Sequence, residues 1–196
     1  MITKDTYRFF KSVIPPHVCE DIIKFGLSSN IKTGMTGNYN QTNLSQNDLV
    51  DIQKVRKSSI AWLGGEWIYK WIRPYVNEVN KDWKFDINSI DNFQFTIYKE
   101  NEFYDWHADY FPKKDNPRDR KISLSLSLSD PKDYEGGDLE FIVEDIPKKR
   151  HSVICNELLN RGSLVIFPSF VIHKVNPITS GTRYSLVIWH EGPKWK

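Results

Sequence analysis

The stretch ISLSLSLS, residues 122–129, alternates apolar and polar residues without interruption. A period of two is typical of a β-strand, because successive side chains point to opposite faces of a sheet. The leucines would share one face and the serines the other. Two interpretations stay open. Either the serines face water on a surface strand, or the leucines pack under helices while the serines leave room inside a barrel for a polar ligand.

Four further stretches of the second half are also short and β-rich, and Gly, Pro, Asp or Asn separates them. They read FQFTIY (93–98), DLEFIV (138–143), SLVIF (163–167) and TRYSLVIW (182–189). No strand–helix–strand alternation is visible among them, which disfavours a parallel α/β sheet. The pattern predicts a mostly β fold, either a double-sheet jelly roll or a sandwich, with its core in residues 90–196.

The first half of the chain predicts helices that brace this sheet. Two prolines precede the stretch VCEDIIKFGL (18–27), whose apolar residues recur at helical spacing. Residues 66–83 carry a second amphipathic stripe, with Pro74 as a candidate kink. Between these segments, residues 32–48 are rich in Gly, Asn, Thr and Ser, which predicts a long exposed loop.

The composition limits the size of the protein and the kind of partner. With 196 residues, 39% of them hydrophobic, the chain can bury one core, so we expect a single domain over 1–196 in which 1–85 is a helical support region. The 27 basic and 25 acidic residues nearly cancel, which argues against nucleic-acid or membrane-surface partners. No signal pattern or long apolar run appears, so a cytoplasmic location is expected. Cys19 and Cys155 predict buried thiols rather than a disulfide framework.

The stretch YDWHADYF, residues 104–111, carries the first candidates for chemistry. His107 and Asp109 are two residues apart, a spacing that would place both side chains on one face of a strand. A carboxylate is costly to bury alone, so the pair predicts a cation, a hydrogen-bond network or water beside it. A chain with 5 His and 15 Asp contains roughly 0.4 such pairs by chance, so the pair alone is weak evidence.

A second histidine and an arginine follow in the stretch FPSFVIHKVNPITSGTRYSLVIW, residues 167–189. His173 comes after one predicted strand, and Arg183 opens the next. Two histidines and one carboxylate that leave the other positions open are the ligand set that suits non-haem Fe(II). Together these residues favour a metal centre over a purely structural pair.

On these residues the chain resembles the Fe(II)/2-oxoglutarate-dependent oxygenases, specifically the prolyl 4-hydroxylase-like branch with the bacterial and phage PKHD-type hydroxylases. The blocks LSDPKDYEGGDLEF (128–141) and 167–189 are similar to that family, and FFKSVIPPHVCEDIIKFG (9–26) is similar to its N-terminal entry. The resemblance implies a double-stranded β-helix (jelly roll) braced by helices. It implies hydroxylation of a C–H bond with release of succinate and CO2. It also implies Fe(II), 2-oxoglutarate and O2, with ascorbate as a candidate reductant.

The resemblance also implies roles for individual residues. His107, Asp109 and His173 would bind the iron, and Arg183 would hold the distal carboxylate of 2-oxoglutarate. A guanidinium can form two parallel charge-assisted hydrogen bonds with a carboxylate, which a lysine cannot reproduce. Further candidates are Ser185, Tyr98 and Trp189 for the cosubstrate, and Tyr104 and Trp106 for the substrate. For the aromatic residues, a core position with a satisfied polar tip is an equally open interpretation.

Two positions narrow the expected chemistry. Collagen-type prolyl hydroxylases carry lysine where this chain has Arg183, so the resemblance is closer to the PKHD-type members. Halogenating relatives have a small residue at the position of Asp109, so the carboxylate implies hydroxylation. We therefore expect a prolyl residue in a peptide or protein as the substrate, with a free amino acid or other small molecule as the alternative.

Two other functional classes stay open as alternatives. A zinc hydrolase could use the same three ligands, but it would need a general base near the metal and has no use for Arg183. A non-catalytic jelly-roll module could bind a peptide or sugar through the seven tryptophans and leave the ligands free of metal.

The remaining histidines and one charged run have ordinary expected roles. His17, His151 and His190 are expected at surface or structural positions. Residues 113–121, KKDNPRDRK, predict a solvated turn. Alternatively, this run and residues 32–48 form a lid that closes over a substrate.

Overall fold

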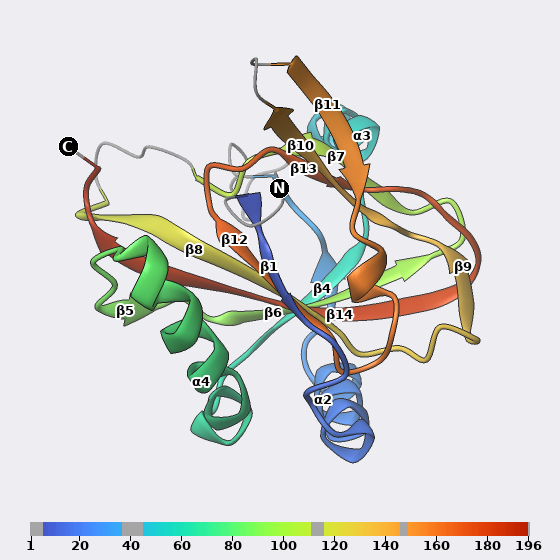
Figure 1. Cartoon of the computed structure of the whole chain (residues 1–196). Coiled ribbons are helices and arrows are strands. Elements are labelled where there is room, and N and C mark those ends of the chain that lie inside the picture. The colour runs from blue at the N-terminus through green and yellow to red at the C-terminus, as the bar shows by residue number, and fades with distance from the viewer. Residues whose placement is uncertain (1–5, 37–44, 111–115, 146–148, 196) are drawn as a thin grey trace.

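Two β-sheets face each other and contain most of the regular structure (Figure 1). The computed structural model describes residues 6–36, 45–110, 116–145 and 149–195. Within these residues the large sheet has nine strands. Its main path runs β1 (Arg8–Phe10), β12 (Leu164–Pro168), β8 (Arg118–Ser127), β14 (Ile178–Pro193), β6 (Phe93–Lys99), β4 (Ser59–Leu63) and β2 (Lys32–Thr33). β5 (Ser89–Ile90) and β9 (Tyr134–Gly136) also pair with β14.

The smaller sheet has five strands in the described part of the chain. Their order is β11 (Lys149–Ile154), β10 (Leu139–Asp145), β13 (His173–Val175), β7 (Phe103–His107) and β3 (Arg56–Lys57). The strands of both sheets pair antiparallel with their neighbours. This arrangement confirms the predicted mostly β fold of two facing sheets, a double-stranded β-helix.

Three α-helices and one 3-10 helix complete the described chain. They are α2 (Pro16–Ser28), α3 (Gln46–Val55), α4 (Glu66–Trp83) and η1 (Asn156–Leu158). The helices predicted at 18–27 and 66–83 are confirmed as α2 and α4. Figure 1 shows both on the side of the large sheet that faces away from the smaller sheet. None of the helices described here is both long and apolar enough to cross a bilayer.

The two helices pack on the leucine face of β8. Ile22 of α2, Ile72 of α4 and Leu124 of β8 are fully buried in one apolar cluster. Gly26 permits the close approach of α2, because a Cβ at this position would lie 2.4 Å from the Phe95 ring of β6. Burial of this apolar surface is the main favourable contribution to folding and holds the large sheet against its helices.

The serine face of β8 points between the two sheets. Ser123, Ser125 and Ser127 are all buried, and Ser123 Oγ donates to Ser169 Oγ over 2.9 Å. The interpretation of a surface strand with its serines in water is therefore wrong. Ser125 lines the internal cavity, in agreement with the alternative that small polar side chains leave room there.

The N-terminal half supplies strands as well as helices. β1, β2 and β4 extend the large sheet and β3 joins the smaller one, so residues 1–85 are more than a helical support. The sequence pattern does not predict α3, although Ser45 and Asp48 form a capping box at its start. Both β2 and the start of α3 lie inside the predicted loop 32–48, of which residues 37–44 lie outside the described residues.

The charged run 113–121 is only partly a turn. Its residues 118–121 begin β8, and Asp119 and Lys121 are buried there. The prediction of a solvated turn is wrong for this part because the strand starts earlier than its apolar alternation. Residues 113–115 lie outside the described residues.

Cys19 and Cys155 are buried free thiols, as predicted. Burial raises the pKa of Cys19 to about 11 and that of Cys155 to about 12. Because the thiolate is the reactive form, both side chains are chemically inert at neutral pH.

The other histidines lie away from the interior between the sheets. His17 and His151 are exposed. His190 of β14 is 1% exposed, and its Nε2 lies 3.1 Å from the hydroxyl of Tyr69 on α4. Burial lowers the pKa of His190 to about 4, so the neutral ring is the form that the helix–sheet contact accommodates.

We expect His190 to make the fold sensitive to acid. The neutral ring contributes stability that is fully present above the unfolded pKa of about 6.5 and is lost as the pH falls toward about 4. Between pH 7 and pH 5 this loss amounts to about 2 kcal/mol of unfolding free energy. Denaturant unfolding at both pH values should show a shallower loss in His190→Gln than in the wild type, with His17→Gln as the control. Identical pH dependence in the wild type and His190→Gln would contradict this prediction.

Candidate metal centre and its pocket

The smaller sheet brings two candidate ligands together on neighbouring strands. The register of β7 and β13 pairs His107 with His173 and Tyr104 with Val175, so two residues of β7 oppose one residue of β13. This β-bulge re-aims the strand, and both Tyr104 and His107 turn inward. Their rings stack with centroids 3.5 Å apart and an interplanar angle of 11°.

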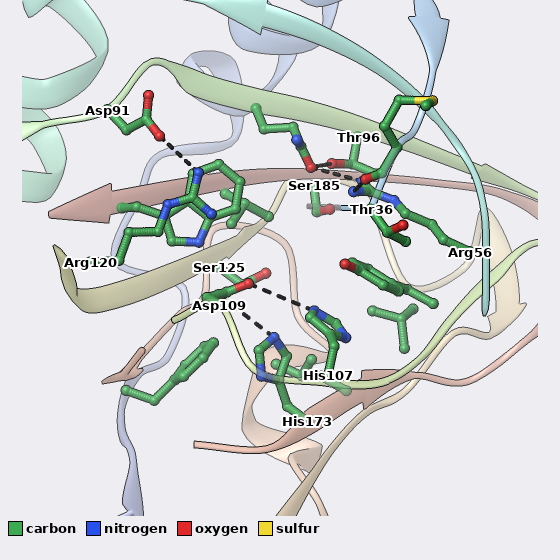
Figure 2. Close-up of a pocket in the computed structure, with 18 of the residues that line it drawn as sticks. Thr36, Arg56, Asp91, Thr96, His107, Asp109, Arg120, Ser125, His173 and Ser185 are labelled. Carbon is green, nitrogen blue, oxygen red and sulfur yellow. Dashed lines mark hydrogen bonds and ion pairs between the residues drawn. The ribbon is translucent and has the colours of Figure 1, made fainter. Parts of the chain in front are cut away.

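The carboxylate lies beyond the strand rather than on it. β7 ends at His107, and Asp109 occupies the bend that follows. The expectation that both residues share one face of a strand is therefore wrong, although both side chains reach the same point. Asp109 Oδ1 lies 3.7 Å from His107 Nε2, and Asp109 Oδ2 lies 3.7 Å from His173 Nε2 (Figure 2).

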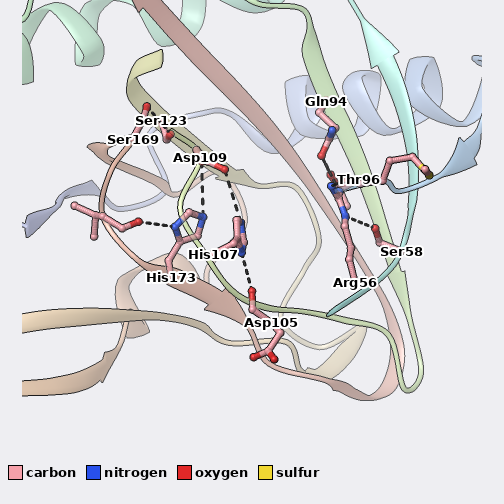
Figure 3. Close-up of polar contacts among 12 residues, drawn as sticks. Arg56, Ser58, Gln94, Thr96, Asp105, His107, Asp109, Ser123, Ser169 and His173 are labelled. Atoms are coloured by element: carbon pink, nitrogen blue, oxygen red, sulfur yellow. Dashed lines mark hydrogen bonds and ion pairs between the residues drawn. The ribbon is translucent and has the colours of Figure 1, made fainter. Parts of the chain in front are cut away.

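Backbone carbonyl groups orient both imidazole rings. His107 Nδ1 lies 2.7 Å from the carbonyl oxygen of Asp105, and His173 Nδ1 lies 2.9 Å from that of Val171 (Figure 3). A carbonyl oxygen only accepts, so each Nδ1 carries the proton and donates it. In the neutral form of each ring the lone pair of Nε2 is then free and points at Asp109, which is the usual arrangement of histidines that bind a metal.

The protonation states also favour a cation. The pKa of His107 is lowered to about 3, mainly by burial and secondly by the neighbouring His173. This ring is therefore neutral at neutral pH. Burial alone would raise the pKa of Asp109, but His173, His107 and Arg120 outweigh it and keep the pKa below its usual range. A neutral imidazole and an ionised carboxylate are the forms that bind metal ions.

The geometry of this group fits a small metal ion. The candidate ligand atoms of His107, Asp109 and His173 all lie within 4.8 Å of one another. Asp109 Oδ2 is buried and has no hydrogen-bond partner among the described residues. A buried carboxylate oxygen without a donor is costly, and a cation at this point would remove the cost. The donor set of two imidazoles and one carboxylate suits Fe(II).

A cavity of about 310 Å³ opens beside this group, between the two sheets. Its wall on the large sheet is built from β6 and β14, whose register places Arg183 opposite Tyr98 and Ser185 opposite Thr96. Arg183 is 3% exposed. Among the residues that the structure describes, no hydrogen bond or ion pair engages its guanidinium.

Arg56 of β3 is a second buried guanidinium on the cavity wall. It donates to Ser58 Oγ (2.9 Å), to the carbonyl oxygen of Met35 (3.0 Å) and to Gln94 Oε1 (2.8 Å), all of which are neutral acceptors (Figure 3). Its guanidinium also lies 4.5 Å from the centre of the Tyr104 ring. Sequence reasoning does not identify Arg56, because an arginine in the charged stretch QKVRKSS has no distinguishing pattern.

The outer wall of the cavity combines an aromatic ring with an ion pair. The Arg120 guanidinium lies 3.7 Å from the centre of the Trp189 ring and forms a 2.8 Å ion pair with Asp91. Figure 2 shows this pair on the far side of Asp109 from Arg56. Trp189 lines the cavity, as the sequence predicts for it. The sequence does not identify Arg120 and Asp91, because Arg120 lies in a charged run and Asp91 lies in the short connection between β5 and β6.

Of the two candidate substrate residues, Tyr104 and Trp106, only the first lies on the cavity wall. Tyr104 lines the cavity beside His107. Trp106 does not line it: the ring is 36% exposed, and the ammonium group of Lys174 lies 4.7 Å from its centre. The bulge turns Trp106 away from the cavity wall, and a substrate contact at this residue stays a prediction.

Comparisons with known proteins agree with this geometry. Residues 93–191, half of the chain, match the family model of the 2OG-Fe(II) oxygenase superfamily. A PKHD-type hydroxylase of Idiomarina loihiensis is 34% identical over 92 residues, which cover 47% of this chain and 38% of the relative. A PKHD-type hydroxylase of Synechococcus sp. is 39% identical over 88 residues, 45% of this chain and 36% of the relative. The match thus spans about two fifths of the length of the curated relatives.

Solved structures show the same fold over nearly the whole chain. A Pseudomonas putida prolyl-4-hydroxylase superposes with a TM-score of 0.67 at 18% identity, covering 98% of this chain and 95% of the other. A Trichoplax adhaerens prolyl hydroxylase in complex with a hypoxia inducible factor peptide fragment gives 0.69 at 17% identity, covering 96% and 84%. Identities this low are evidence for the fold alone.

We expect loss of metal affinity when a candidate ligand is removed. His173→Ala or Asp109→Ala should weaken Fe(II) binding at least about 100-fold, because removal even of a residue that only orients a ligand costs 10–100-fold. The apo fold should persist, since the apolar cluster under the large sheet does not contact the metal. Anaerobic Fe(II) titration measures the affinity, circular dichroism measures the fold, and His17→Ala is the control. A His173→Ala protein with unchanged Fe(II) affinity would refute the assignment.

Proposed function

Because the chain belongs to the 2OG-Fe(II) oxygenase superfamily, we propose that it is a 2-oxoglutarate-dependent dioxygenase that hydroxylates a substrate C–H bond. His107, Asp109 and His173 are the proposed ligands of Fe(II). The bound metal would supply oxygen activation coupled to decarboxylation of 2-oxoglutarate, with release of succinate and CO2. The observation that carries the proposal is the His–Asp–His group at the cavity, beside a buried guanidinium that has no acidic partner among the described residues.

The cavity is positively charged in a way that suits 2-oxoglutarate. Arg183 and Arg56 are both buried, and neither has a carboxylate partner among the described residues. Arginine is seldom fully buried without one. A dicarboxylate in this cavity could place one carboxylate at the metal and the other on Arg183, where the guanidinium fork matches it. Ser185 and Tyr98 flank Arg183 on the same wall and are proposed to orient that carboxylate.

The same observation disfavours the two alternative classes. A zinc hydrolase has no need for two buried guanidiniums that lack acidic partners in the part of the chain that the structure describes. A module that only binds a peptide or sugar would leave Asp109 Oδ2 buried without a donor or a cation. The oxygenase uses both features, since the metal satisfies the carboxylate and the cosubstrate satisfies the guanidinium.

We propose a prolyl residue in a peptide or protein segment as the substrate. Tyr104 and Trp189 form aromatic walls on two sides of the His–Asp–His group and could enclose a pyrrolidine ring. An extended proline-containing segment is already close to its bound conformation, so little conformational entropy is lost on binding. The Trichoplax prolyl hydroxylase, which has the same fold, is in complex with a peptide fragment, so the fold itself is compatible with a peptide substrate. Ascorbate as a reductant, a cytoplasmic location and a lid over the substrate stay predictions.

Removal of the Arg183 guanidinium should weaken cosubstrate binding selectively. Arg183→Ala should cost on the order of 2–5 kcal/mol in 2-oxoglutarate affinity, since a charged contact is lost from a buried site. Fe(II) affinity should change little, and Arg183→Lys should recover only part of the loss. Anaerobic titration that follows the visible charge-transfer band of the Fe(II) chelate measures both. The exposed Arg150→Ala is the matched control, and equal 2-oxoglutarate affinity in Arg183→Ala and this control would place the carboxylate elsewhere.

A peptide library tests the substrate. The protein is incubated with Fe(II), 2-oxoglutarate and proline-containing peptides, and succinate release is followed together with the peptide mass. We expect succinate formation coupled to a gain of about 16 Da on proline, the mass of one added oxygen. Succinate coupled to a free amino acid or another small molecule, and to no peptide, would reject the prolyl substrate and keep the oxygenase.

A further inference from the structure

The three candidate ligands are not held equally. Both histidines are fixed through Nδ1 by carbonyl groups of the smaller sheet. Asp109 lies past the end of β7, and its Oδ2 has no hydrogen-bond partner among the described residues. Its position therefore depends on the contacts of the next residue in the chain, Tyr110.

Backbone hydrogen bonds join Tyr110 to the turn before His173. The N–H of Tyr110 donates to the carbonyl oxygen of Ser169 over 2.9 Å, and the N–H of Ser169 donates to that of Lys121 over 3.0 Å. The bend that carries Asp109 and the turn that leads into β13 are thus connected through one residue, Ser169.

A single indole packs against both of these segments. The centre of the Trp195 ring lies 6.5 Å from the centre of the Tyr110 ring and 5.9 Å from that of the Phe170 ring. Both contacts are edge-on. On its other sides it contacts the ammonium group of Lys121 at 3.7 Å and the Phe85 ring at 5.3 Å. Trp195 therefore fills the space between the two turns and the start of β8.

The path of the chain fixes where this indole lies. The backbone N–H of Trp195 donates to Asp119 Oδ2 over 2.8 Å, and Asp119 is itself buried. Three residues earlier, a Cβ at Gly192 would lie 1.7 Å from the carbonyl oxygen of Asp86. Only glycine permits this approach, so the segment from Gly192 to Trp195 has little freedom to shift.

We infer that Trp195 is a positioning residue for the carboxylate ligand Asp109. It acts through Tyr110 and Phe170, which it holds together at the base of the two turns. The inference rests on the proposed role of Asp109 in metal binding. It adds a residue from outside the part of the chain that matches the superfamily, which ends at residue 191.

The test compares metal affinity with global stability in four variants. Trp195→Ala removes the indole, Trp195→Phe keeps an aromatic ring, and Phe170→Ala removes a side chain that is 52% exposed, so it should not affect folding. Trp67→Ala, which removes a tryptophan on α4 that is 38% exposed and lies far from Asp109 in the sequence, is the control. The measurements are the Mn(II) dissociation constant, the visible spectrum of the Co(II)-loaded protein, which reports coordination geometry, and the melting temperature of the apo protein.

We expect the Mn(II) dissociation constant of Trp195→Ala to rise about tenfold, as for other residues that orient a ligand. Phe170→Ala should show a smaller rise, Trp195→Phe should stay near the wild type, and Trp67→Ala should not change. The Co(II) spectrum of Trp195→Ala should also change, which a merely structural role would not cause.

Two results would overturn the inference. One is wild-type Mn(II) affinity and an unaltered Co(II) spectrum in both Trp195→Ala and Phe170→Ala. The other is a loss of Mn(II) affinity that Trp67→Ala shows to the same extent. An Asp109→Ala protein with wild-type Mn(II) affinity would instead refute the proposed metal site, so the two failures are distinguishable.

Discussion

The antiparallel pairing of β14 with both β6 and β8 is the constraint on which the core and the cavity both depend. This ladder places Arg183 opposite Tyr98 on one side and Ser185 opposite Ser127 on the other. Residues of β14 that alternate with these, such as Leu186 and Ile188, point to the opposite face and are fully buried under the helices. A shift of one residue in the pairing register of β14 would move its apolar side chains to the cavity face and its polar side chains to the helix-covered face. The packing of the helices therefore also fixes which side chains line the cavity.

The two faces of this part of the sheet contribute differently to the stability of the fold. Its helix-covered face buries apolar side chains and stabilises the fold, whereas its inner face buries the Arg183 guanidinium and several serines, which stabilise little by themselves. A ligand that neutralises these charges binds only the folded chain, so metal and cosubstrate would add to the stability of the protein. The unfolding free energy of the protein should therefore be higher with the cavity occupied than with it empty.

Sequence patterns predicted the parts of the fold that have a strong periodicity. The alternation of 122–129 identified β8, and the helical stripe of 66–83 identified α4 with the bounds observed. They also identified His107, Asp109, His173 and Arg183, which the fold brings to one cavity. Short strands such as β3 were missed because two residues cannot show a period.

What the sequence could not predict depends on local irregularities and on contacts between distant segments. The bulge in β7 breaks the period of two, so the sequence pattern puts Trp106 beside the cavity, whereas in the structure its ring is 36% exposed and does not line the cavity. Arg56 and Arg120 reach the cavity from strands whose neighbours are far away in sequence, and both lie in charged stretches that resemble ordinary surface. Their environment exists only in the folded chain.

The bulge also restricts which residues this strand can carry. Asp105 accepts a 2.8 Å hydrogen bond from the N–H of Trp106 through its side chain, while its own carbonyl oxygen accepts the bond from His107 Nδ1. One residue therefore satisfies the amide that the irregular ladder exposes and also fixes the tautomer of a ligand. Among natural variants of this chain, position 105 should favour short polar side chains, aspartate and asparagine above all, because these accept hydrogen bonds from neighbouring backbone N–H groups. Position 106, one residue further along, should vary more widely in residue type.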